Sequence, residues 1–195
     1  MVDPGEFLSL QPITKPEDLK GMRIRFSGSA QESMIKKFGG TPVGLAMPEV
    51  YDSLERGIID GVAVGPSVIA SYKLNEVIKY ATRGLRSFFS TQVIFMNKDK
   101  WESLSPEDQK LLDSLTGTVI YEKGTEIYMG AYEKGFSLGK ESGVTINDIS
   151  EADRQVWKEK AAPVVDEYLE KMKEKGLPGK EILDMMHEIS AKFKQ

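Results

Sequence analysis

The chain has 195 residues, which fits one domain or one and a half and excludes repeat arrays and large multidomain proteins. Hydrophobic residues make up 40% and charged residues 29% of the sequence, proportions that exclude a disordered chain and a coiled-coil rod. The net charge of -4 provides no basic field for a phosphate backbone, so we expect no nucleic-acid partner. Because the sequence has no cysteine and one histidine, disulfides and metal sites built from thiolates or from several histidines are excluded. We expect no metal site and no cofactor.

Short apolar runs alternate with helical patterns through the first half of the chain, as in βαβ units. A single helical turn is predicted at residues 16–21, before the first strand. Strands are predicted at 22–26, 41–45 and 58–66, and helices at 29–38 and 48–57, followed by a broken helix at 67–77. Ser29 is predicted to cap the first of these helices.

The second half reads as one strand followed by long helices. Residues 88–97 carry the strongest β signal of the chain and predict a central strand. Ser105 and Pro106 predict the start of a helix that extends to about residue 138. Five glycines in that helix would each cost about 1 kcal/mol relative to alanine, so it either kinks or packs closely against another segment. A short strand at 144–147, a helix from Ser150 with a kink at Pro163, and a helix at 179–194 complete the chain.

Open α/β sheets bind ligands beyond the carboxyl ends of their strands, which directs attention to the loops at 25–29, 46–48 and 64–67. Strand alternation puts Arg23 and Arg25 on one face, with Arg25 at the carboxyl end of its strand. A guanidinium there could bind a carboxylate with two parallel hydrogen bonds; an ordinary surface arginine is the alternative. No nucleophile elbow and no phosphate-binding loop occurs, so a serine triad and nucleotide binding through such a loop both lack their signatures.

Several motifs resemble, in order and spacing, the solute-binding proteins of tripartite ATP-independent periplasmic (TRAP) transporters, of the C4-dicarboxylate-binding type. The most specific is Pro-Ile-Thr-Lys-Pro-Glu-Asp-Leu-Lys-Gly-Met-Arg-Ile-Arg at residues 12–25. Others occupy residues 38–43, 48–61, 72–77, 93–98 and 101–109. The resemblance covers nearly the whole chain and is most specific between residues 12 and 109.

The resemblance implies an extracytoplasmic receptor with two α/β lobes that close on an organic acid and deliver it to membrane permease subunits. The family arginine that pairs with the substrate carboxylate matches Arg25. Met47 falls where the family has a pocket wall, with core packing as an equal alternative. Residues 62–64 are apolar where the family has a polar side chain, so backbone groups at Val64 or the hydroxyl of Ser67 would replace it. Ser27 and Ser29 would supply hydroxyls where the family has Val-Pro.

Family members are longer, and the resemblance implies that most of the first lobe is missing from this chain. The expected fold is therefore α/β, a periplasmic-binding-protein-like lobe with a type II-like mixed sheet and flanking helices, plus long C-terminal helices. The expected segments are a lead-in at 1–21, the second lobe at 22–87, a return strand and bridging helix at 88–148, and C-terminal helices at 149–195. Exposed apolar surface on this fragment would favour a homodimer.

The sequence thus predicts a periplasmic receptor for a small carboxylate ligand, although no signal peptide is visible within it. The alternative function is a scaffold or partner-binding module that kept the lobe fold and lost transport. An enzyme is a distant third alternative.

Overall fold

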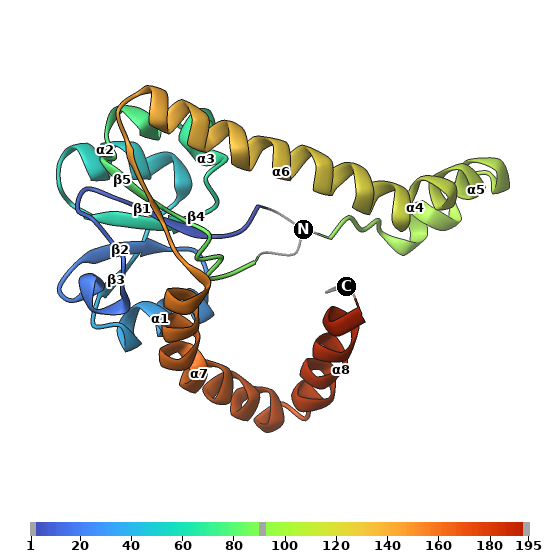
Figure 1. Ribbon diagram of the computed structural model, residues 1–195. Helices are drawn as coiled ribbons and strands as arrows, with labels where there is room; N and C mark the ends of the chain where they lie inside the picture. The colour runs from blue at the N-terminus through green and yellow to red at the C-terminus, as the bar shows by residue number, and fades with distance from the viewer. Residues whose placement is uncertain (1–2, 90–92, 193–195) are drawn as a thin grey trace.

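The computed structural model describes residues 3–89 and 93–192, which are built around a mixed β-sheet (Figure 1). The strands are β1 (Glu6–Ser9), β2 (Arg23–Phe26), β3 (Thr41–Gly44), β4 (Gly61–Val64), β5 (Tyr80–Arg83) and β6 (Thr145–Asp148). The α-helices are α1 (Ser29–Lys37), α2 (Val50–Glu55), α3 (Val68–Ser71), α4 (Lys98–Glu102), α5 (Pro106–Leu115), α6 (Thr118–Glu141), α7 (Glu151–Glu174) and α8 (Gly179–Lys192). Short 3-10 helices are η1 (Pro16–Leu19), η2 (Met47–Glu49) and η3 (Leu74–Glu76).

The sheet has the order β3-β2-β4-β1-β5-β6, and its first three strands run parallel. Arg25 lies opposite Val43 of β3 and Val62 of β4. The carboxyl ends of these strands therefore lie at one edge of the sheet, which confirms the mixed α/β fold and the predicted grouping of the three loops.

Two strands were not predicted from the sequence. β1, which we expected to be part of a lead-in segment, pairs antiparallel with both β4 and β5 in the middle of the sheet. All four of its residues are buried. β5 extends the sheet to β6, which runs parallel to it. Both strands are only four residues long and follow no strong alternating pattern, so their burial comes from pairing with distant segments.

Helices cover both faces of the sheet, and each face has its own core. Phe7 and Leu8, adjacent on β1, are fully buried on opposite faces. One core includes residues of α2, α3 and α6, and the other includes residues of α1 and α7 (Figure 1). In the second core the Trp157 ring lies 5.8 Å from that of Phe7 and 5.1 Å from that of Phe38.

The predicted helix from Pro106 to about residue 138 is divided into α5 and α6. The division falls at Gly117, whose φ of +64° is the left-handed conformation that glycine adopts without strain. Beyond it α6 is continuous to Glu141, and its glycines differ in environment. A Cβ at Gly135 would lie 2.1 Å from the Pro66 carbonyl oxygen, whereas none of the described atoms beyond the helix's own backbone lies within 4 Å of a Cβ built at Gly124. Close packing therefore explains Gly135 and not Gly124.

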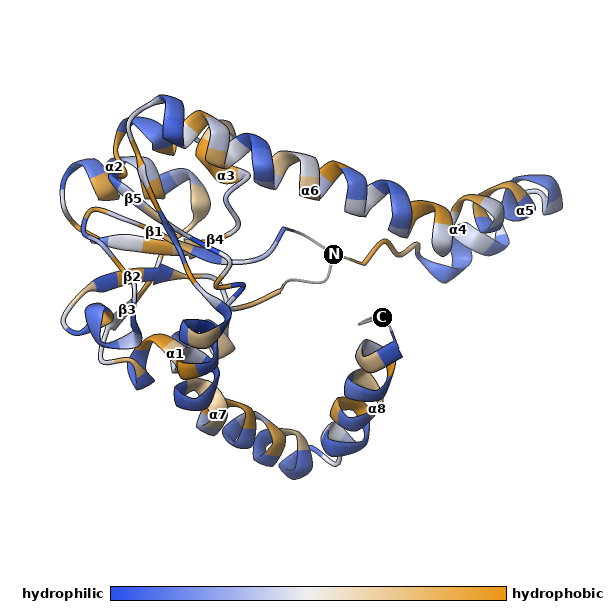
Figure 2. Ribbon diagram, in the orientation of Figure 1, coloured by the Kyte–Doolittle hydropathy of each residue, from blue (hydrophilic) through white to orange (hydrophobic). Residues whose placement is uncertain are grey.

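The predicted central strand at residues 88–97 is wrong for the described part of that segment. Residues 88–89 and 93–97 are not in a strand, and residues 90–92 lie outside the described residues. Val93, Ile94 and Phe95 are 75%, 83% and 87% exposed, and Figure 2 shows this hydrophobic segment leading away from the sheet to α4. A strand needs a neighbour to satisfy its backbone hydrogen bonds, and no described strand pairs with this segment.

The strand and the two helices predicted at the C-terminal end are confirmed, whereas the kink at Pro163 stays a prediction. Ser150 caps α7 by accepting a hydrogen bond from the Asp153 backbone N–H at 3.1 Å, and Pro163 lies inside that helix. At the start of α1 the prediction was wrong by one residue, because Gly28 is the N-cap and Ser29 is the first helical residue. No helix in the described ranges is long and apolar enough to cross a lipid bilayer.

Candidate functional site

Arg23 and Arg25 share one face of β2 but have different environments. Arg23 forms a two-pronged ion pair with Asp60, with Nε to Oδ2 at 2.9 Å and Nη2 to Oδ1 at 2.8 Å. The Arg23 backbone N–H also donates to this carboxylate at 2.8 Å. These hydrogen bonds raise the pKa of Arg23 and lower the pKa of Asp60. Arg23 is therefore a partly exposed structural residue whose charge is neutralised by Asp60 and whose Nε and Nη2 already donate to it.

Arg25 is buried, with 7% of its surface exposed, and has no carboxylate partner among the described residues. Its Nε donates to the Leu45 carbonyl oxygen at 3.0 Å, which fixes the side chain over the loop that follows β3. Its two terminal nitrogens have no hydrogen-bond partner in the described chain, and neither is sealed from solvent. Arg25 thus presents both donors of a guanidinium fork from a fixed position.

Burial lowers the pKa of Arg25 because desolvation disfavours the charged form, and the nearby Tyr72 opposes this effect. An arginine nevertheless keeps its charge at neutral pH. A buried cation without a counter-ion is costly, and an ionised carboxylate that binds in two-pronged geometry would neutralise it. The arrangement can therefore hold an anion and has no means of activating one chemically.

The hydroxyls predicted around Arg25 have internal partners or face elsewhere. Both the backbone N–H and the hydroxyl of Ser27 donate to Gln31 Oε1, at 2.8 and 3.1 Å. Ser29 is exposed at the start of α1 and lines a small cleft between α1 and α7. Ser27 therefore remains beside the end of β2, while Ser29 faces away from the loops after β3 and β4.

The loop after β4 is held by the N-terminal segment. The Ser67 backbone N–H donates to Asp3 Oδ2 at 2.9 Å, and its hydroxyl donates to Asp3 Oδ1 at 3.1 Å. Val64 and Met47 are partly buried and pack against the core that includes α2, α3 and α6. Of the predicted side chains, the structure leaves only that of Arg25 both buried and with free donors among the described residues.

Three residues of this edge were missed in the sequence analysis: Asp3, Gln31 and, through its carbonyl group, Leu45. A fourth missed residue, Asp60, lies at the opposite end of the parallel strands, beside Arg23. Asp60 had a local signal, since Asp60-Gly61 opens the strand beside the one that carries Arg23. Gln31 also had a signal, because it lies four residues after Ser27 at the start of a predicted helix. The contact between Asp3 and Ser67 spans 64 residues and has no signal in a single sequence.

A fifth missed residue, Glu6, holds the turn after β5 from inside the protein. Its carboxylate is fully buried and accepts hydrogen bonds from the Thr82 hydroxyl at 2.7 Å and the Tyr132 hydroxyl at 3.2 Å. It also accepts from the backbone N–H groups of the turn, which are those of Gly84, Leu85 and Arg86. Burial raises the pKa of Glu6, although these donors oppose the shift.

Comparison with known proteins gives a consistent result across nearly the whole chain. The profile of bacterial extracellular solute-binding protein family 7 matches residues 6–172. The C4-dicarboxylate-binding periplasmic protein DctP of Rhodobacter capsulatus is 30% identical over 164 residues, which are 83% of this chain and 48% of that protein. The ectoine-binding periplasmic protein TeaA of Halomonas elongata is 33% identical over 177 residues, which are 89% of this chain and 50% of that protein.

Among solved structures, a TRAP solute-binding protein from Rhodoferax ferrireducens, crystallised with copurified benzoate, superimposes with a TM-score of 0.87. It is 26% identical, and the match covers 98% of this chain and 61% of the other. The chain spans about half the length of the curated relatives it matches. The profile match and the shared fold agree with the motifs around Arg25, and the chain therefore belongs to the bacterial extracellular solute-binding proteins of family 7.

Proposed function

We propose that this chain is a receptor in the periplasm that binds a small organic acid and delivers it to the membrane permease of a TRAP transporter. The family supports a solute receptor rather than an enzyme. The named relatives bind a C4-dicarboxylate, ectoine and benzoate, which share a carboxylate group. A carboxylate is also the group that a free guanidinium fork recognises best.

The observation that carries the proposal is the state of Arg25. Its guanidinium is buried, charged and unneutralised within the described chain, and two of its nitrogens are free to donate. Arg23, two residues earlier on the same strand, is instead neutralised by an ion pair with Asp60. The contrast supports ligand binding by Arg25, because nothing in the fold itself satisfies that side chain.

The neighbouring residues have subsidiary roles in the proposed site. Ser27 follows Arg25 at the strand end, and the lone pairs of its hydroxyl oxygen remain available while its hydrogen is donated to Gln31. Met47 begins η2, after β3, and Val64 is the last residue of β4; together they would form an apolar wall for the body of the acid. Ser67 would contribute through the loop that Asp3 holds, and Ser29 would contribute least because it faces α7.

The homodimer expected from the sequence stays a prediction. Its support is the exposure of large apolar side chains away from the sheet, including Ile94, Phe95 and, on α6, Ile127. Light scattering of the chain measures its mass directly. A monomer at all concentrations would contradict the dimer and leave the receptor function untouched.

Thermal unfolding in the presence of small acids tests the proposed function. A ligand that binds only the native state stabilises it by about 2.7 kcal/mol at a concentration of 100 times its Kd. We expect at least one of succinate, benzoate and ectoine to raise the melting temperature, and succinamide and benzamide to leave it unchanged. A partner-binding scaffold would respond to none of them. Equal shifts with the acids and the amides would contradict the role of a carboxylate.

A further inference from the structure

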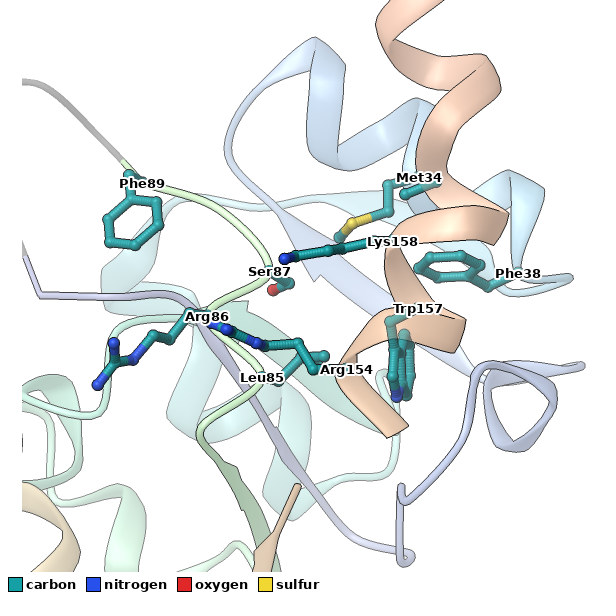
Figure 3. A pocket seen from close by; sticks show the side chains of 10 residues that line it. Met34, Phe38, Leu85, Arg86, Ser87, Phe89, Arg154, Trp157 and Lys158 are labelled. Atoms are coloured by element: carbon teal, nitrogen blue, oxygen red, sulfur yellow. The ribbon is translucent and has the colours of Figure 1, made fainter. Parts of the chain in front are cut away.

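A cavity of about 240 Å³ lies between α1, α7 and the segment that follows β5. Its lining includes Met34 of α1, Phe38 directly after α1, and Trp157 of α7, all members of the core on the face of the sheet opposite Arg25. Phe89, 54% exposed, is another apolar lining residue, and Figure 3 shows it on the far side of the opening from Trp157. The cavity is therefore separate from the loops at the end of β2.

The polar lining of this cavity consists of three cationic residues and Ser87. Arg86, Arg154 and Lys158 line it, and no aspartate or glutamate does. Neither the Arg86 guanidinium nor the Lys158 ammonium group has a hydrogen bond or ion pair in the described parts of the chain. Figure 3 shows Lys158 extending from α7 toward the segment that carries Ser87. The opening thus combines an aromatic wall with positive charge that the fold does not neutralise.

Two further donors of the lining are buried without a partner. Trp157 is 3% exposed, and its Nε1 has no hydrogen-bond acceptor. Arg154 donates from Nη2 to Glu151, but its Nε is sealed from solvent and unpaired. Unsatisfied buried polar atoms are few in native proteins, and of the three side-chain atoms of this kind among the described residues, two belong to residues that line this cavity. Both atoms are buried behind the lining and are not exposed to a ligand in the cavity, so an anion would be held by the exposed cationic groups of Lys158 and Arg86.

The mouth of the cavity is held in place by the buried carboxylate of Glu6. Arg86 has a φ of +50°, a left-handed conformation that is uncommon for residues other than glycine. Its backbone N–H donates to Glu6 Oε1 at 3.2 Å, and the N–H of Leu85 donates to Oε2 at 3.2 Å. This network fixes the backbone from which the Arg86 side chain leaves, so the cationic rim does not depend on a free loop.

We propose that this cavity binds a small amphipathic anion with a flat apolar body, such as an aryl carboxylate or sulfonate. The ring lies against Trp157 and Phe38, and the acid group lies at the opening near Lys158 and Arg86. The proposal is independent of the function assigned to Arg25, because the two sites lie on opposite faces of the sheet. It gives the molecule a second ligand site with the same charge preference.

Tryptophan fluorescence with benzenesulfonate as the probe tests the proposal on the whole chain. The sequence has two tryptophans, so Trp101→Phe leaves Trp157 as the only reporter. We expect a saturable change in Trp157 emission with benzenesulfonate. Benzenesulfonamide, which has the same ring and no charge, is expected to bind at least about tenfold more weakly, because the cationic rim favours the anion. Equal affinity for the two compounds, or no saturable change with the sulfonate, would overturn the proposal.

Matched substitutions locate the bound anion. Lys158→Gln is expected to weaken benzenesulfonate binding several-fold, and Arg86→Gln is expected to do the same. Lys160→Gln is the control, because Lys160 lies on the same helix, pairs with Glu17 and does not line the cavity. Arg25→Ala should leave the signal unchanged. Loss of binding in Arg25→Ala with retention in Lys158→Gln would place the anion at the other site and overturn this proposal while supporting the proposed function.

Discussion

The sheet with its covering helices and the projecting part of the chain contain similar side chains in opposite environments. Phe7 of β1 is fully buried between the sheet and Trp157, whereas Phe95, just before α4, is 87% exposed. Figure 1 shows α4, α5 and the adjacent end of α6 extending away from the sheet, and Figure 2 shows hydrophobic residues along them. A hydrophobic side chain is therefore buried in this molecule where its segment pairs with distant strands, and a hydrophobic sequence alone does not bury it.

The projecting part is stabilised by local interactions instead. Ser105 caps α5 by accepting a hydrogen bond from the Asp108 backbone N–H at 3.1 Å. Ion pairs within single helices include Lys98 with Glu102 and Lys123 with Glu126. An exposed pair of this kind contributes about 0.3–0.5 kcal/mol in a typical helix, so these contacts define helices without fixing a tertiary fold.

The largest expected effect contrasts one phenylalanine from each region. Phe7→Ala removes a fully buried ring and is expected to lower the free energy of unfolding by about 3–5 kcal/mol. Phe95→Ala removes an exposed ring and should change it by less than about 0.5 kcal/mol. Urea unfolding followed by circular dichroism measures both. Similar losses in the two variants would show that Phe95 is buried in solution and would remove the distinction between the regions.

Two glycines of α6 sharpen the comparison within a single helix. Gly135→Ala places a Cβ 2.1 Å from the Pro66 carbonyl oxygen, and we expect a loss of about 1–3 kcal/mol from the forced backbone shift. At Gly124 a Cβ meets open space, so Gly124→Ala should stabilise the helix by up to about 1 kcal/mol. Thermal unfolding gives the sign of each change. Stabilisation by both substitutions would mean that α6 does not pack against the loop after β4.

The pH dependence of the pair between Arg23 and Asp60 is the smallest effect. Asp60 has a pKa lowered from its ordinary 3.8, so its carboxylate stabilises the fold above that pH and the contribution is lost as pH falls through the lower folded value. Asp60→Asn should therefore be less stable than the parent at pH 7, and the difference should shrink below about pH 3.8. Urea midpoints across this range measure it. A difference independent of pH would contradict an ionic origin.

Local patterns predicted the parts of the molecule that depend on neighbours in sequence. Ser105 and Ser150 cap helices as expected, and strand alternation correctly predicted that Arg23 and Arg25 share one face of β2. The buried strand β1 and the contact between Asp3 and Ser67 were missed, because each depends on segments more than 50 residues away. The error at 88–97 has the same cause, since a strand requires a partner that no local pattern reveals.

The most direct measurement of the central claim is titration calorimetry with succinate and benzoate on Arg25→Lys and Arg23→Lys. Lysine keeps the charge and removes the planar guanidinium, and Arg23 is the matched control because its guanidinium already forms a two-pronged ion pair with Asp60. We expect Arg25→Lys to weaken binding of the preferred acid at least about tenfold, the loss of one charge-assisted hydrogen bond, and Arg23→Lys to leave it unchanged. Equal weakening in both variants, or none in Arg25→Lys, would contradict the account.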